Sequence, residues 1–363
     1  MKQIKNTMIG CLGTLVIMAG CCRANQESRD DLLVLKEQGS FTVGGNVIQE
    51  EGTYDATQFD NFKPYPAGQT FHGDHAYVFY QVPNDARPLP LVFLHGAGQS
   101  AKTWETTPDG REGFQNLFLR RGFSTYLVDQ PRRGKAGRST VETTIKPIAD
   151  EQMWFDIFRI GNYPHYHEGV QFPKDKKSLE NFFRQVTPNT GDFDARVITK
   201  SLVALFDTLE AGILVTHSQG GLPGWMTAVK SEKVKAVVAY EPGTYLFPEG
   251  ELPRPISGRT GVLSGVAVSM EEFKKLTQIP IVLYFGDNIG KEVSEELGAE
   301  NWRTRLALGY QFVEAVNRHG GDATLVELPK VGIYGNTHFL MSDLNNIEVA
   351  NLLSDWLKEH KLD

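Results

Sequence analysis

Ser218 lies in a segment that could expose a nucleophilic hydroxyl group. Residues 216–220 (THSQG) follow the apolar run 212–216 (GILVT) and precede a stretch with helical spacing. A serine at a sharp turn from a strand into a helix exposes its hydroxyl above the sheet, and the helix N-terminus favours the negative charge that develops there. Thr216 stands where such turns commonly carry glycine. The segment predicts Ser218 as a nucleophile; an ordinary turn that contains a serine is the alternative.

A serine hydroxyl needs a base to accept its proton, and histidine is the usual base. Three histidines follow Ser218 in the chain: His319, His338 and His360. His319 precedes two glycines at the end of a helical stretch, and His360 lies in the polar C-terminal tail, so both are expected at the surface. His338 lies in the loop 335–339 (GNTHF), where the base that serves such a turn arrives in the chain. We predict His338 as the base; a solvated loop histidine is the alternative.

Two carboxylates could orient the imidazole of His338. Glu241 ends the apolar run after the Ser218 turn, and Asp287 follows a later run. Many enzymes with this turn place their acid two residues beyond a Gly-Asp pair, but that position is Ile289 here, which cannot orient an imidazole. Glu241 is one strand away from the serine, within reach of a long side chain. We therefore predict Glu241 and keep Asp287 as the alternative; either could also be only a turn or cap residue.

Two backbone N–H groups are expected to bind the oxyanion of an acyl-transfer reaction. One belongs to Gln219, the residue after the nucleophile, and the other to the glycine-rich loop 95–98 (HGAG). We predict Ala97 in that loop, with Gly98 as the alternative. His95 is expected to hydrogen-bond the loop rather than to act as a base.

Apolar runs alternate with helical patterns along the chain. The runs expected to form strands are 76–82, 89–94, 124–128, 212–216, 234–240, 280–285 and 323–328. The expected helices are 113–121, 195–209, 302–318, 347–360 and one that follows the Ser218 turn to about residue 233. This alternation predicts an α/β fold in which a mostly parallel sheet carries helices on both faces. Ligands bind beyond the carboxyl ends of such strands, and the polar residues there are His95, Asp129, Ser218, Glu241 and Asp287.

Two long segments interrupt the alternation. Residues 140–190 are rich in aromatic side chains, and residues 245–277 are rich in glycine and proline. Both follow strands that end at the predicted site, so we expect them to form a cap over it. Trp154, Phe158 and His165 in the first segment are candidate pocket residues, although aromatic residues in a cap equally often form its own core.

The most specific patterns of the chain are residues 95–98 (HGAG), 107–113 (TPDGREG), 129–131 (DQP) with 137–139 (GRS), 216–221 (THSQGG) and 240–243 (YEPG). From about Ala76 to the C-terminus, the chain resembles the bacterial novel esterase group of the α/β-hydrolase superfamily. The resemblance implies an α/β-hydrolase fold with an inserted cap, cleavage of carboxylic esters without a cofactor, and a Ser-Glu-His triad, which favours Glu241. The chain departs from the group at residues 132–136 (RRGKA), where the turn is longer.

The N-terminus has the pattern of a targeting segment. Lys2 and Lys5 precede an apolar stretch at 8–19, which is too short to span a bilayer stably. Small residues then precede Cys21, as in the lipobox of bacterial lipoproteins, where that cysteine is acylated. We expect an extracytoplasmic protein, either anchored at Cys21 or simply cleaved and secreted; a buried N-terminal helix is the alternative.

The predicted organisation has three parts: a leader over 1–22, a tether over 23–40, and an α/β-hydrolase domain over 41–363. The cysteines all lie in or beside the leader, so the domain contains no disulfide. A formal charge of −7 over 363 residues argues against nucleic acid as a partner. The segments 72–75 (HGDH) and 165–168 (HYHE) lack a recognised metal-ligand spacing, so we predict no metal site.

The expected partner is a small or lipid-like ester, with membrane contact only through the possible lipid anchor. Two other functions stay open: a lactonase or other acyl hydrolase with the same triad, and a non-catalytic surface binding protein on a hydrolase scaffold. Because all three triad positions are filled, the sequence favours an enzyme.

Overall fold

The computed structural model describes residues 32–363. The predicted leader, Cys21 and the first part of the predicted tether lie outside these residues. The chain divides into one unit that ends at Val34 and a second from Leu35 to Asp363, to which all elements below belong. No helix within the described range is long and apolar enough to cross a membrane.

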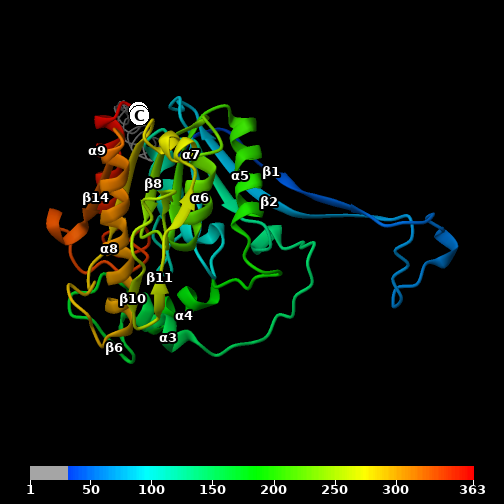
Figure 1. The fold of residues 1–363 in the computed structure, drawn as a ribbon. Helices are drawn as coiled ribbons and strands as arrows, with labels where there is room; N and C mark the ends of the chain where they lie inside the picture. The colour runs from blue at the N-terminus through cyan, green and yellow to red at the C-terminus, as the bar shows by residue number, and fades with distance from the viewer. Residues whose placement is uncertain (1–31) are drawn as a thin grey trace, which may run out of the picture. The chain divides into compact units, whose positions relative to one another are not determined.

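An eight-stranded sheet forms the centre of the second unit (Figure 1). Its strands, in spatial order, are β1 (Leu35–Gln49), β2 (Thr70–Pro83), β4 (Thr125–Asp129), β3 (Leu91–Leu94), β7 (Gly212–His217), β8 (Val234–Tyr240), β13 (Pro280–Phe285) and β14 (Asp322–Glu327). The six strands from β4 to β14 are mutually parallel. At one edge β2 pairs antiparallel with β4, and β1 pairs antiparallel with β2. The predicted mostly parallel sheet is confirmed.

Helices cover both faces of this sheet. The cluster on one face includes side chains of α5 (Ala195–Leu209), α6 (Gly221–Ala228), α7 (Met270–Leu276) and α8 (Leu297–Arg318). The cluster on the other face includes side chains of α2 (Phe114–Arg120), α3 (Glu151–Ile157), α4 (Lys176–Arg184) and α9 (Asn346–Glu359). Both faces of the sheet are therefore shielded from solvent. This explains why the inner strands carry apolar residues at successive positions instead of alternating apolar and polar residues.

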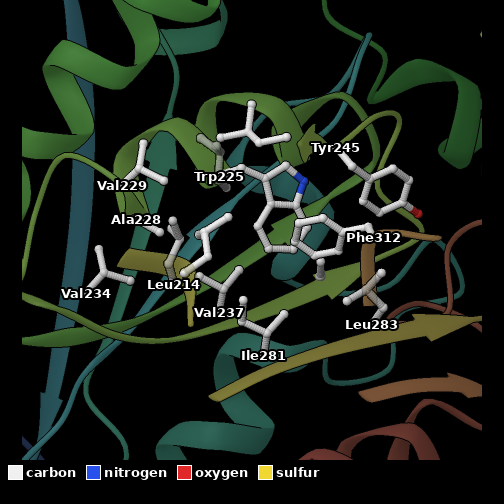
Figure 2. Packing of buried hydrophobic residues seen from close by; sticks show 14 of the residues in the cluster. Leu214, Trp225, Ala228, Val229, Val234, Val237, Tyr245, Ile281, Leu283 and Phe312 are labelled. Atoms are coloured by element: carbon white, nitrogen blue, oxygen red, sulfur yellow. The ribbon is translucent and has the colours of Figure 1, made fainter. Parts of the chain in front are cut away.

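The strand β7 shows how successive side chains serve the two faces. Leu214 packs in the α5–α8 cluster, whereas its neighbours Ile213 and Val215 pack in the α2–α9 cluster. In the first cluster, Trp225 of α6 lies beside Phe312 of α8, with ring centroids 4.9 Å apart (Figure 2). These contacts fix α6, and hence the turn that precedes it, against the sheet.

The structure corrects the predicted tether over 23–40. Strand β1 begins at Leu35, inside that range, and pairs with β2 as far as Gln49. Phe41 and Val43 pack against the core, while Thr42 between them is exposed. Because a one-sided edge strand needs few apolar residues, this segment has the polar composition of a linker.

The two insertions join different cores. The first carries α3, β5 (Gly161–Asn162), β6 (His165–Tyr166) and α4, and its Phe155, Phe158 and Phe182 belong to the α2–α9 cluster. The second carries β9 (Leu246–Pro248), β10 (Ile256–Gly258), β11 (Gly261–Leu263), β12 (Val266–Val268) and α7. Its Phe247 and Phe273 belong to the opposite cluster.

Candidate active site

Ser218 lies at the turn between β7 and α6, as predicted. Residues Ser218–Gly220 form a short 3-10 turn, and Ser218 has φ +54°, in the left-handed region that side chains other than glycine rarely adopt. The loop after β3 comes close: a Cβ atom added at Gly96 would lie 2.8 Å from Cβ of Ser218. A glycine is therefore required at 96, and the strained turn is held between this loop and α6.

Thr216 replaces the glycine that is common two residues before the nucleophile, and the structure accounts for it. Thr216 is fully buried, and a Cβ atom at Gly224 of α6 would lie 2.6 Å from its Cγ2 methyl. The residue without a side chain is therefore Gly224 on the helix and not a glycine on the strand. The close packing of strand and helix at this turn is kept by Gly224 instead.

His338 is hydrogen-bonded to Glu241. Its Nδ1 lies 2.6 Å from Oε2 of Glu241, and both side chains are buried. Asp287 has other partners: its carboxylate accepts hydrogen bonds from the backbone N–H groups of Asn288 and Gly335. The geometry therefore favours Glu241 over Asp287 as the acid.

The guanidinium of Arg159, which follows α3, holds the other oxygen of Glu241. Arg159 is fully buried and forms an ion pair with Oε1 of Glu241, while its Nε donates to the carbonyl of Asp287 at 2.7 Å. The backbone N–H of Gly286 donates to the same Oε1 at 2.8 Å. The carboxylate is thus fixed on both sides, with one oxygen left for His338. The sequence analysis missed Arg159, because it lies in an insertion without a motif.

The imidazole of His338 is packed between two aromatic rings. Trp302 of α8 lies with its ring centroid 4.0 Å from that of His338, and Phe158 stacks on it at 5.4 Å. The backbone is held too: the N–H of His338 donates to the carbonyl of Phe158 at 2.9 Å. The carbonyl of His338 lies 3.0 Å from Nε2 of His217, which is the donor in this bond.

This surrounding keeps the imidazole neutral. Burial, followed by the positive charges of Arg159 and Arg305, holds the pKa of His338 well below its usual value. A neutral imidazole whose Nδ1–H donates to Glu241 has its Nε2 lone pair free to accept a proton.

Ala97 and Gln219 line the same cavity as Ser218 and His338. Within the described chain the N–H of Ala97 has no hydrogen-bond acceptor, and that of Gln219 is at the start of the turn, where helical N–H groups have no internal partner. Both N–H groups are available to an oxyanion. The structure thus brings the predicted donors to the predicted nucleophile.

The longer turn at residues 132–136 anchors the loop that carries Ala97. The buried Arg133 donates from Nη1 to the carbonyl of Gly96 at 2.8 Å and from Nη2 to Asn189. Nε2 of His95 accepts a hydrogen bond from the backbone N–H of Gln130 at 3.3 Å, so His95 holds the loop as predicted. Burial lowers the pKa of His95 to about 3, so it stays neutral.

The cavity at Ser218 has a volume of about 300 Å³. Trp154 and Phe158 line it, as predicted, and α8 contributes Trp302 and Arg305, which the sequence analysis missed. His165 does not line it and is exposed on β6. The lining includes no residue of 245–277, so the cover over the site comes from the first insertion and α8.

In the segment 72–75, the acidic side chain is already paired. Asp74 forms an ion pair with Arg132 at 2.8 Å and accepts from Thr140. From residue 32 onward, no group of three or more histidine, cysteine or acidic side chains is placed to hold a metal ion.

Comparisons with known proteins identify the family and the fold of the chain. A model of the Alpha/beta hydrolase family matches residues 91–350. The solved structure of a novel bacterial esterase is 31% identical, with 90% of this chain and 97% of that chain covered and a TM-score of 0.70. A probable secreted lipase, phiG, from Fungal sp. (strain ATCC 74256), is 27% identical over 335 residues, which are 78% of this chain and 85% of the relative.

Proposed function

Because the chain belongs to the Alpha/beta hydrolase family, we propose that it is a serine esterase that cleaves carboxylic esters through an acyl intermediate on Ser218. One observation carries the proposal. Ser218 and His338 line one cavity, and Nδ1 of His338 is 2.6 Å from a carboxylate oxygen of the buried Glu241. This arrangement has the order and roles of a serine hydrolase triad.

In the first half of the reaction, Nε2 of His338 accepts the proton of the Ser218 hydroxyl as its oxygen attacks the ester carbonyl. Glu241 stabilises the imidazolium that results. The carbonyl oxygen becomes an oxyanion and accepts hydrogen bonds from the N–H groups of Ala97 and Gln219. Each such donor contributes roughly 10²–10³-fold to the rate in serine hydrolases.

Collapse of this intermediate breaks the ester bond. The imidazolium of His338 gives its proton to the leaving alkoxide, which departs as an alcohol and leaves the acyl group on Ser218. A water molecule then attacks the acyl group, with His338 again taking the proton. The bond to Ser218 breaks, His338 returns the proton to the Ser218 oxygen, and the acid is released. Every step uses the chain's own groups and water, so the proposal needs no cofactor.

We also propose that the protein acts outside the cytoplasm on a small or lipid-like ester. The apolar leader pattern before Cys21 supports export, and one relative is described as a secreted lipase. Lipid attachment at Cys21 is part of this proposal, and mass spectrometry of the mature N-terminus tests it.

The test is turnover of p-nitrophenyl acetate and butyrate by the wild type and by Ser218→Ala. We expect the wild type to be active and the variant to lose at least about 10³-fold in kcat. A lactone panel run beside the esters distinguishes an esterase from a lactonase. A wild type without activity on any acyl ester or lactone would favour a binding protein instead.

A further inference from the structure

Arg305 brings an unpaired positive charge into the active-site cavity. It lies on α8 and lines the cavity together with Ser218 and His338. Its Nη1 donates to the carbonyl of Asn301 at 2.8 Å and to Oδ1 of the same residue at 2.7 Å. Over residues 32–363, no carboxylate lies within ion-pair distance of this guanidinium.

The remaining donors of the guanidinium are open to a ligand. Nε and Nη2 of Arg305 have no acceptor in the described structure, and neither is among its buried atoms without a partner. They are therefore accessible, on a side chain that lines the cavity. An arginine presents such donors as a planar fork, which matches the two oxygens of a carboxylate.

Glu241 acts on the charge of Arg305, but no ion pair joins the two side chains in the described chain. Glu241 is the acid of the site, and it is already shared between Arg159 and His338. Arg305 is close enough to contribute to the lowered pKa of His338. A partly desolvated cation without an ion-pair partner is costly, so the cavity favours an anion beside Arg305.

Resting on the proposed esterase function, we propose that the natural substrates are short esters that carry a free carboxylate, and that Arg305 binds this carboxylate. The cavity of about 300 Å³ has room for a short chain between the ester and the carboxylate. Its aromatic side chains Trp154, Phe158 and Trp302 provide apolar contacts for the methylene groups of that chain.

A purely structural role for Arg305 makes a different prediction. Its guanidinium lies 5.3 Å from the ring of Trp302, which packs on His338, so the arginine could serve only to hold that ring. Loss of such a role would slow neutral and anionic esters alike. Loss of a carboxylate-binding role slows the anionic esters more than their neutral isosteres, and a ratio of rates separates the two cases.

The experiment compares kcat/KM for anionic esters and their neutral isosteres by proton release in a pH-stat. The acyl-side pair is monomethyl glutarate and methyl 5-methylhexanoate; the alcohol-side pair is 4-acetoxybutanoate and 4-methylpentyl acetate. We expect the wild type to prefer the anionic member of one pair by about tenfold or more, the size of one charge-assisted hydrogen bond. The pair that shows the preference tells which side of the ester carries the carboxylate.

Variants assign the preference to Arg305. Arg305→Met should lower the anionic-to-neutral ratio at least about tenfold, and Arg305→Lys, which keeps the charge without the fork, should lower it less. Arg318→Met, at the far end of α8 and 50% exposed at its side chain, removes the same charge outside the cavity and should leave the ratio unchanged. A wild type with no anionic preference in either pair, or a ratio that survives Arg305→Met, overturns the inference.

Binding measured without turnover separates this inference from the proposed function. In a Ser218→Ala background, calorimetry with monomethyl glutarate and with 4-acetoxybutanoate should show binding of at least one of them that weakens about tenfold or more when Arg305→Met is added. No binding, or binding that the arginine does not affect, overturns the inference. If the carboxylate binds but no ester is hydrolysed by the wild type, the carboxylate site stands and the esterase proposal fails.

Discussion

At the scale of single residues, the site depends on how one buried carboxylate is compensated. Glu241 has no exposed surface, yet it faces the charged Arg159 on one side and His338 on the other. A buried carboxylate of this kind is stable only while its partners are present. Its geometry therefore links the proposed base His338 to a side chain in the first insertion.

The choice between the two candidate acids can be tested by paired amide substitutions. Glu241→Gln should lower kcat by about 10²–10⁴-fold, because an amide cannot stabilise the imidazolium of His338. Asp287→Asn should lower it less than about tenfold, since the hydrogen bonds of the Asp287 carboxylate in the described chain come from loop N–H groups. The measurement is steady-state hydrolysis of p-nitrophenyl butyrate, with circular dichroism to check folding. A larger loss for Asp287→Asn would reverse the assignment.

Removal of Arg159 should affect both stability and catalysis. Arg159→Met leaves Glu241 buried without its cation, which should cost about 3–5 kcal/mol of unfolding free energy. Adding Glu241→Gln removes the unpaired charge, so the double variant should recover much of that loss. Denaturant unfolding of the four proteins in this cycle measures the coupling. Additive losses would show that the two side chains do not stabilise each other.

The lowered pKa of His338 should determine the acidic limit of the proposed activity. The base must be neutral, and a lowered pKa keeps it neutral at pH values where a free histidine, with a pKa of about 6.5, is protonated. We therefore expect the acidic limb of kcat/KM to lie below pH 6.5. Arg305→Met, which removes one of the charges that lower this pKa, should move the limb to higher pH. A wild-type limb at or above pH 6.5 would contradict the account.

At the scale of elements, the contact between β7 and α6 determines the shape of the nucleophile turn. Thr216 of the strand and Gly224 of the helix form a complementary pair. Gly224→Ala should lower the unfolding free energy by about 1–3 kcal/mol, because its methyl would overlap that of Thr216. Thr216→Ser removes the opposing methyl, so the double variant should recover most of the loss in a thermal melt. Equal melting temperatures for Gly224→Ala with and without Thr216→Ser would refute the pairing.

The elements that bury an apolar run on both faces could be predicted from the sequence. Strands β8 and β13 and helix α5 have the predicted bounds, because the pattern of their own apolar side chains indicates where each element is buried. Strand β1 could not be predicted, because it is stabilised by pairing with β2 and contributes few apolar residues. Ser218, Glu241 and His338 follow strands in a recognisable order. Arg159 and Arg305 reach the site only through the packing of an insertion and of α8, and neither lies in a local motif.

At the scale of the whole molecule, the buried histidines link stability to pH. Burial is the main cause that lowers the pKa of His95, to about 3, and those of His217 and His338. The unfolded chain takes up protons at these positions below about pH 6.5, and the folded protein does not. The unfolding free energy therefore decreases as the pH falls from 6.5 towards the folded pKa values.

One buried carboxyl acts in the opposite direction. Burial raises the pKa of Asp343 to about 7, so this group stabilises the fold at low pH and loses that effect as the pH rises through 7. The effect of the three imidazoles exceeds that of the one carboxyl. The unfolding free energy should therefore fall by roughly 2 kcal/mol between pH 6.5 and 5.5. Guanidinium unfolding at both pH values tests this, and Asp343→Asn should make the loss larger. An equal or higher midpoint at pH 5.5 would contradict it.

The proposed reaction takes place at the carboxyl ends of the parallel strands. Its central claim is that the hydroxyl oxygen of Ser218 is acylated. Incubation of the wild type with diethyl p-nitrophenyl phosphate, followed by peptide mass spectrometry, tests this most directly. The account predicts one diethylphosphoryl group per chain, on Ser218, that appears together with the loss of esterase activity and is absent in Ser218→Ala. A modified residue other than Ser218, or full activity of a chain phosphorylated there, would contradict it.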